Sequence, residues 1–241
     1  MDNAPIRLLI HGASGRMGKA LVRLAALDSR LHVVAAVSRS GEPVPDSPAP
    51  AFRPDAMGQA PAFDVAIDFS LPDGFDRLLA ICRQRGSALV SGTTGLEGRQ
   101  LMHLTEAALD IPVVWASNFS LGVVVLHELV RKVAAALPEW QAGIIETHHV
   151  HKVDAPSGTA ATLAQVTSEG NGRTPMIESV RRGEVVGEHT IRFRGIGEML
   201  EIRHLAEDRD IFARGALEAA CRLALQPAGQ FSLGELLAVE A

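Results

Sequence analysis

The densest group of chemically versatile side chains lies at residues 146–160, in the stretch ETHHVHKVDAPSGTA. Three of the nine histidines, His148, His149 and His151, fall within four positions, and Lys152 follows directly. A histidine can exchange a proton near neutral pH, and a lysine ammonium can hold an anion or donate a proton. These residue types leave three interpretations open: a metal site, a proton-transfer site and a solvated polar loop.

An extended backbone would not bring the three histidines to one metal ion. Successive side chains of a strand point to opposite faces, so His149 and His151 would share a face and His148 would point away. The segment has no HExxH motif and no cysteine beside it. Metal binding is therefore disfavoured, and the residue types leave two interpretations open: proton transfer and a solvated histidine-rich turn before a capped helix.

The second half of the same stretch predicts an anion site. Pro156, Ser157 and Gly158 are typical of a helix start, with Ser157 as the N-cap. The backbone N–H groups of Gly158 and Thr159 would then be available to a carboxylate. The stretch thus combines proton donors with an anion cradle, which fits a reductase.

A glycine-rich loop, GASGRMG, follows the first predicted strand and opens the first predicted helix. Gly12, Gly15 and Gly18 would let the backbone approach a pyrophosphate at the helix N-terminus. The spacing is GxxGxxG, with Ser14 where the GxGxxG fingerprint has its second glycine. Although glycine turns also serve packing alone, the position after strand one favours a dinucleotide site.

The end of the second predicted strand carries Ser38 and Arg39 instead of an acid. An acid there would bind the adenosine ribose hydroxyl, whereas a cation accommodates a 2′-phosphate. We therefore predict that NADPH is used at least as well as NADH. The alternative is that Ser38 and Arg39 are ordinary solvated turn residues and that Glu42 supplies the acid instead. The loops SGTTG (91–95) and ASNFS (116–120) follow later strands, where ligands bind in open α/β sheets, so they are candidate cofactor contacts.

Two different orders of elements must position these residues. The first half alternates apolar runs with helical-period segments, which predicts strands at 6–10, 32–37, 63–69, 87–90 and 112–116 and helices at 16–27, 72–85 and 97–109. This order is typical of a Rossmann-like α/β fold with a doubly wound parallel sheet. Residues 41–61 hold six of the thirteen prolines, and we predict a surface loop there.

The second half predicts an α+β domain with a mixed or antiparallel sheet. Its expected elements are helices at 121–137, from Ser157 onward and at 210–225, and strands at 142–146, 176–182, 188–194 and 199–205. The last helix could pack on either domain.

Composition limits the classes of protein. The 241 residues are 47% hydrophobic, enough for a substantial core, and the net charge of −5 argues against nucleic-acid binding. Cys82 and Cys221 lie in apolar segments without CxxC spacing, which predicts reduced core cysteines and a cytoplasmic setting. No apolar run is long enough to predict a membrane span or a signal segment.

Seven segments together resemble one enzyme family. They are GASGRMG, DFS (68–70), SGTTG, ASNFSLGV, ETHHVHKVDAPSGTA, GEHTIRF and FARGALEAA. They span the chain from its first strand to its last long helix, and they resemble the 4-hydroxy-tetrahydrodipicolinate (dihydrodipicolinate) reductases of bacterial and plant lysine biosynthesis. ETHHVHKVDAPSGTA is close to a signature of that family and is more specific than the glycine loop.

The resemblance implies that NADPH or NADH reduces a cyclic dicarboxylate imine, formed by loss of water from 4-hydroxy-tetrahydrodipicolinate, to tetrahydrodipicolinate in the diaminopimelate pathway to lysine. It implies a dinucleotide-binding domain of residues 1–118 plus 208–241. Residues 119–207 would form the substrate-binding and tetramerisation domain of a homotetramer.

The resemblance also implies roles for single residues. His148 would be the proton donor or acceptor, and Lys152 would be the second proton donor and would hold a carboxylate. His149 would contact the substrate, and Gly158 and Thr159 would bind the other carboxylate. The residues implied to surround the cofactor are Gly12, Ala13, Ser14, Gly15, Arg16, Met17, Arg39, Gly92, Thr93, Thr94, Ala116, Ser117, Asn118 and Phe119.

Two departures from the family pattern alter these expectations. Ser38 stands where many members carry a glutamate that binds the adenosine ribose, which favours NADPH. Residues 167–179, TSEGNGRTPMIES, look shorter or more irregular than the flexible lid-like region of the family, so closure and oligomer contacts are expected to differ.

Three rival functions remain. Semialdehyde and homoserine dehydrogenases share the two-domain Rossmann plan but lack the histidine–lysine segment. A redox-sensing or binding module that holds NADPH without catalysing a reaction would leave Lys152 without a role. A zinc hydrolase would require stoichiometric metal.

Overall fold

The computed structural model describes residues 4–45 and 47–238, and the chain forms two compact units. Among these residues, one unit contains the chain up to Phe119 and from Phe212 onward, and the other contains Ser120–Ile211. Residues 1–3 and 239–241 of the expected first domain lie outside the described residues.

The first unit is built on a seven-stranded sheet in which every neighbouring pair is parallel. In spatial order its strands are β11 (Gly229–Phe231), β6 (Pro112–Trp115), β5 (Ala88–Ser91), β4 (Val65–Asp68), β1 (Ile6–His11), β2 (Leu31–Val37) and β3 (Ala51–Phe52). Its helices are α1 (Arg16–Ala25), α2 (Pro72–Arg85), α3 (Gly98–Ala107), α6 (Asp210–Leu223) and α7 (Leu233–Leu237). The predicted Rossmann-like parallel sheet is confirmed.

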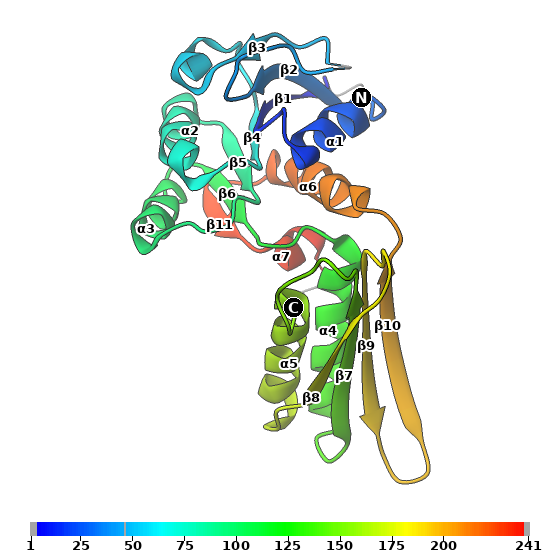
Figure 1. Cartoon of the computed structure of the whole chain (residues 1–241). Coiled ribbons are helices and arrows are strands. Elements are labelled where there is room, and N and C mark those ends of the chain that lie inside the picture. The colour runs from blue at the N-terminus through cyan, green and yellow to red at the C-terminus, as the bar shows by residue number, and fades with distance from the viewer. Residues whose placement is uncertain (1–3, 46, 239–241) are drawn as a thin grey trace. The chain divides into compact units, whose positions relative to one another are not determined.

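The central strands of this sheet are apolar throughout because both of their faces are covered. Leu8, Leu9 and Ile10 of β1 are consecutive and all fully buried, although consecutive strand residues point to opposite faces. Helices α2 and α3 lie on one side of the sheet and α1 and α6 on the other (Figure 1).

The prediction that residues 41–61 form only a surface loop is wrong. The segment contains β3, which pairs with β2, and a 3-10 helix at Pro54–Gln59 whose Met57 is fully buried. Prolines are compatible with this structure because β3 is a two-residue edge strand and Pro54 occupies the first helical position, where its missing N–H has no partner to lose.

The second unit is a four-stranded mixed sheet with two helices. In spatial order its strands are β10 (Met199–Ala206), β9 (Gly187–Arg194), β7 (Gln141–His148) and β8 (Met176–Arg181). β7 pairs parallel with β8, and the other pairs are antiparallel. The expected α+β unit with a mixed sheet is confirmed.

Helices α4 (Leu121–Ala136) and α5 (Gly158–Asn171) contact each other and the strands of this sheet (Figure 1). Their core joins Leu126 and Leu163 to Ile144, Ile191 and Phe193 of the strands. Because strand side chains alternate, residues in phase with Ile144 on β7 and with Ile191 on β9 face the helices.

Serine N-caps fix the starts of both helices in the second unit. Ser120 Oγ accepts from Val123 N, and Ser157 Oγ accepts from Ala160 N, each at 3.3 Å, so the predicted Ser157 cap is confirmed. No helix of the described chain is both long enough and apolar enough to span a membrane.

The segment 167–179, expected to be irregular, is mostly regular structure. α5 continues to Asn171, Gly172 ends it in the left-handed conformation with φ 71°, and β8 begins at Met176. Glycine adopts this conformation without strain and commonly terminates helices. Only a short connection separates the two elements.

Candidate active site

The glycine loop joins β1 to α1 by close backbone packing. Gly12 has a positive φ of 81°, and a Cβ there would lie 2.4 Å from the carbonyl oxygen of Phe69. A Cβ on Gly18 would lie 2.2 Å from the oxygen of Gly12. α1 begins at Arg16 without a side-chain cap at Gly15, so its first N–H groups suit an anionic phosphate.

The predicted cofactor residues follow four strands of the same parallel sheet. Gly12–Met17 follow β1, Arg39 follows β2, Gly92–Thr94 follow β5 and Ala116–Phe119 follow β6. The carboxyl ends of parallel strands share one sheet edge, which is where ligands bind in this class of fold. The structure therefore brings all of these segments to one edge of the first unit.

Ser38 is turned into the fold, whereas Arg39 is exposed. Ser38 is 2% exposed, and its Oγ accepts from Gly41 N at 3.2 Å. The hydroxyl thus holds the turn, and the Arg39 guanidinium is the group of this pair that solvent or a ligand can reach.

A buried carboxylate that sequence reasoning did not single out holds these loops together. Asp68, at the end of β4, is fully buried and contacts His11 Nδ1 at 2.9 Å. It also accepts from Ser91 Oγ at 3.1 Å and from Thr93 Oγ1 at 2.8 Å. Burial by itself would raise the pKa of Asp68, but the hydrogen bond and charge of His11, aided by other donors, lower it.

We predict that Asp68→Asn weakens NADPH binding by about 10-fold, because the amide cannot accept from His11 and both hydroxyls at once. The dissociation constant can be measured by nicotinamide fluorescence. The control is Asp64→Asn. Asp64 directly precedes β4, and this change breaks a surface ion pair with Arg7. Equal affinity in a folded Asp68 variant would contradict the prediction.

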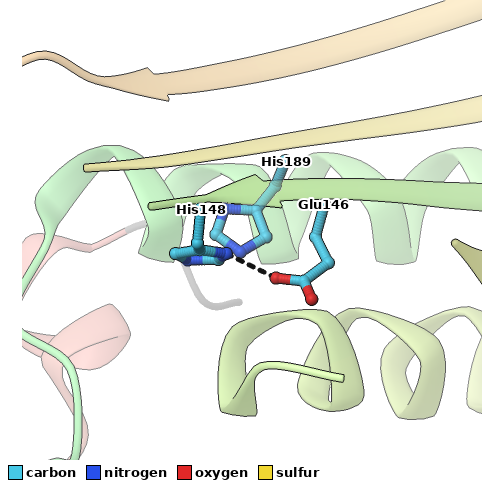
Figure 2. A group of neighbouring side chains, drawn as sticks. All are labelled: Glu146, His148 and His189. Carbon is cyan, nitrogen blue, oxygen red and sulfur yellow. Dashed lines mark ion pairs between the residues drawn. The ribbon is translucent and has the colours of Figure 1, made fainter. Parts of the chain in front are cut away.

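The second unit gathers a buried acid–histidine cluster on the sheet face that α4 and α5 cover. Glu146 and His148 of β7 are in phase with Ile144, and Glu146 pairs in register with His189 of β9. Glu146 is fully buried, and its Oε2 lies 2.5 Å from His148 Nδ1. Figure 2 shows this ion contact with the His189 ring beside it, 5.2 Å from the His148 ring between centroids.

The environment favours a charged Glu146 and a neutral His148. Burial would raise the pKa of Glu146, but hydrogen bonds from Ser179, Arg181 and Ser157 lower it below its ordinary value. Burial lowers the pKa of His148, and the opposing effect of the Glu146 charge does not restore it. At pH 7 the ring is therefore mainly neutral, with one nitrogen able to accept a proton.

The extended backbone assumed for the three histidines stops at the first of them. β7 ends at His148, and a turn follows it. The His149 and His151 rings lie 6.2 Å apart, His149 Nε2 faces Arg209 Nη2 at 3.0 Å, and His151 is largely exposed.

Lys152 and the start of α5 complete the candidate site. Lys152 Nζ lies 2.8 Å from Asp154, a largely exposed partner whose pKa this contact lowers. Gly158 and Thr159 are the first residues of α5, and no atom lies within 4 Å of the Cβ position of Gly158. Open space therefore adjoins the helix end, where N–H groups attract anions.

Among the described residues, Glu146, His148 and His189 offer ligand atoms within 4.8 Å of one another, a donor set that zinc can use. However, Arg181 Nη1 lies 3.0 Å from Glu146 Oε1, and the charges of both Lys152 and Arg181 act on His148. Two cations beside the cluster disfavour a divalent ion, so the arrangement fits proton transfer better.

The comparisons with known proteins agree along the whole chain. A family model described as dihydrodipicolinate reductase, N-terminus, matches residues 6–119, and one described as the C-terminus of the same enzyme matches residues 122–237. A 4-hydroxy-tetrahydrodipicolinate reductase of Xanthomonas campestris pv. campestris is 57% identical over 238 residues, covering 98% of this chain and 100% of the relative. One from Stenotrophomonas maltophilia is 54% identical over 240 residues, with the same coverage.

Solved structures show the same likeness. A dipicolinate-bound dihydrodipicolinate reductase from Paenisporosarcina has a TM-score of 0.80 at 26% identity, covering 95% of this chain and 97% of that one. A DAP dehydrogenase of C. glutamicum, at 16% identity and a TM-score of 0.59 over 98% and 96% of the two chains, shares the fold alone.

Proposed function

The chain belongs to the dihydrodipicolinate reductase family, and we propose that it reduces 4-hydroxy-tetrahydrodipicolinate, through its dehydrated cyclic imine, to tetrahydrodipicolinate in lysine biosynthesis. The observation that carries this proposal is the buried Glu146–His148 pair, followed at once by Lys152 and by the helix start at Gly158. To reduce a dicarboxylate imine, the protein must exchange a proton with the substrate and bind its carboxylates.

A bound nicotinamide supplies the hydride, and the protein supplies a proton, so that the conjugated imine gains two hydrogens. We assign proton exchange to His148, whose neutral ring can take up and return a proton, with Lys152 as the second donor. Lys152 can also hold a substrate carboxylate, since its present partner Asp154 is exposed and such a pair is weak.

We assign the other carboxylate to the N–H groups of Gly158 and Thr159, and a further substrate contact to His149. This assignment is supported by the open space beside Gly158 and by the dipole of the 14-residue helix α5. Dipicolinate, which is bound in the Paenisporosarcina enzyme, is a flat cyclic dicarboxylate and a suitable inert probe.

Gly158→Ala is expected to raise the KM for substrate and the dissociation constant for dipicolinate about 10-fold, because the new methyl group occupies the space beside the helix end. The fold should not change, since the methyl group meets no protein atom within 4 Å. Calorimetry with dipicolinate measures the effect.

Gly98→Ala is the matched control, because Gly98 is also the first residue of its helix and also has open space at its Cβ position. Unchanged dipicolinate affinity in Gly158→Ala would show that no substrate carboxylate binds at this helix end.

We propose NADPH as the preferred cofactor, held by the glycine loop and the neighbouring strand ends. The exposed Arg39 and the absence of an acid at Ser38 support this preference. Arg39→Ala should raise the KM for NADPH about 10-fold and leave that for NADH within about twofold, since only NADPH carries the 2′-phosphate. Steady-state kinetics with both cofactors measures the difference, and an equal loss with both would contradict it.

We further propose a cytoplasmic homotetramer joined through the sheet of the second unit. The face of this sheet opposite α4 and α5 carries the pairs Arg192–Glu201 and Arg203–Glu188, each 2.7 Å long, and these polar rows suit contact with another copy. Light scattering of the purified protein tests the assembly.

The proposed activity is tested with the condensation product of pyruvate and aspartate semialdehyde. NADPH should be consumed when this product is present and not with aspartate semialdehyde alone or homoserine. Turnover of homoserine instead would favour the rival dehydrogenase class.

A further inference from the structure

Arg181, the last residue of β8, contacts both segments that carry the proposed proton-transfer groups. It pairs in register with His148 of β7, so the two side chains lie on the same face. Its Nη1 donates to Glu146 Oε1 at 3.0 Å, and its Nε donates to the backbone oxygen of Lys152 at 3.2 Å. A third bond runs from Nη2 to the backbone oxygen of Asp154. One guanidinium thus fixes the acid beside His148 and the main chain of Lys152.

Glu146 in turn determines which nitrogen of His148 is available. The carboxylate oxygen lies 2.5 Å from Nδ1, so its negative charge favours the neutral tautomer with the hydrogen on Nδ1, which leaves Nε2 to exchange a proton. Nε2 lies beside Gly187, where a Cβ would be 3.2 Å away, so the absence of a side chain there leaves this nitrogen uncrowded.

We infer that Glu146 and Arg181 are positioning residues of the active site. Glu146 holds the orientation and tautomer of His148, and Arg181 holds Glu146 and the backbone that presents Lys152. The inference rests on the proposed function for the roles of His148 and Lys152, and it adds two residues that neither the motif spacing nor the comparisons assign.

The ionisable groups that face His148 come from every neighbouring strand. They are Glu146 on its own strand, Arg181 on β8, His189 on β9 and Lys152 on the following loop. The hydroxyl of Ser157, the N-cap of α5, lies 3.3 Å from Nε2 of His189. Burial lowers the pKa of His189 to about 4, and His204, His127 and His148 act in the same direction, so His189 is neutral at pH 7. Of these three charged groups, Glu146 raises the pKa of His148, and Lys152 and Arg181 lower it.

The test is Glu146→Gln, which keeps the size of the side chain and removes its charge. Burial, Lys152 and Arg181 all lower the pKa of His148, so loss of the carboxylate should lower it further. In a plot of kcat against pH, the limb that reports the protonation of His148 should therefore move to lower pH. The value of kcat should fall about 10-fold or more, while the NADPH dissociation constant stays unchanged. Glu139→Gln, which breaks the exposed pair with Arg173 in the same unit, is the matched control.

A histidine NMR titration of the protein without substrate separates this inference from the proposed function. The His148 titration should move to lower pH in Glu146→Gln even if the substrate were different. An unchanged titration and an unchanged kcat profile would overturn the inference, as would stoichiometric zinc in the wild-type protein that is lost in this variant.

The double variant Glu146→Gln/Arg181→Gln covers the case in which the single change leaves a buried charge that prevents folding. It removes both charges and should fold. Its His148 limb should still lie at lower pH than in the wild type, but by less than in Glu146→Gln, because the Arg181 charge that lowers the pKa of His148 is also gone. If the folded double variant had the kcat and the pH dependence of the wild type, Glu146 and Arg181 would be a structural ion pair only. Arg181→Lys should keep kcat below the wild-type value. A lysine ammonium cannot reach the carboxylate and the two carbonyl oxygens together, as the planar guanidinium of arginine does.

Discussion

His148→Gln should lower kcat by about 100-fold or more, because it removes the group that exchanges a proton with the reacting substrate. The buried Glu146 carboxylate keeps the Arg181 guanidinium as a partner in this variant, so the fold should persist. The NADPH dissociation constant should stay within about twofold, since the proposed cofactor contacts lie in the other unit. Stopped-flow measurement of NADPH oxidation separates the chemical step from binding.

His151→Gln is the control for this change. His151 lies three residues away in the same segment, its side chain is 76% exposed, and its contact with Glu184 spans 3.8 Å. This variant should retain wild-type kcat. Equal rates for His148→Gln and the wild type would remove His148 from the proton-transfer role.

Lys152→Met should lower kcat by about 100-fold or more and also raise the KM for substrate, because it removes both a proton donor and a carboxylate contact. The apolar stem is retained, so packing should change little. Steady-state kinetics across a range of substrate concentrations resolves the two effects. Lys132→Met, at a 66% exposed side chain on α4, is the matched control, and a Lys152 variant with an unchanged KM and kcat would contradict the assignment.

Local patterns predicted the parts of the fold that local physics determines. The apolar runs of β1, β4 and β5 and the serine cap of α5 follow from neighbouring residues alone, because burial on both faces and capping are properties of short segments. β11, with three residues, and α7 were not predicted, since so short a strand is stabilised mainly by its pairing with β6.

The active-site segment was found from sequence, but its supporting residues were not. His148 and Lys152 are conspicuous by type and spacing, whereas Arg181 and His189 come 33 and 41 positions after His148 and meet β7 through sheet register. Register is a tertiary property that one strand's sequence does not specify by itself. The signal that could have identified His189 was its presence in GEHTIRF, a segment that carried the family resemblance.

Asp68 illustrates the same limit in the first unit. Its motif contributed to the resemblance, but nothing local indicates that Ser91 at the end of β5 and Thr93 in the loop after it would donate to its carboxylate. The proline-rich segment shows the opposite error. Its proline content led to the prediction of a loop, but proline is compatible with an edge strand and with the first turn of a helix, and both are present.

Transfer of deuterium from NADPH labelled at C4 of the nicotinamide tests the central claim most directly. The purified protein should convert the condensation product of pyruvate and aspartate semialdehyde into tetrahydrodipicolinate that carries one deuterium, with one NADPH oxidised for each product molecule, and NADH should support the same transfer less efficiently. A folded, NADPH-binding protein that forms no labelled product under these conditions would contradict the account.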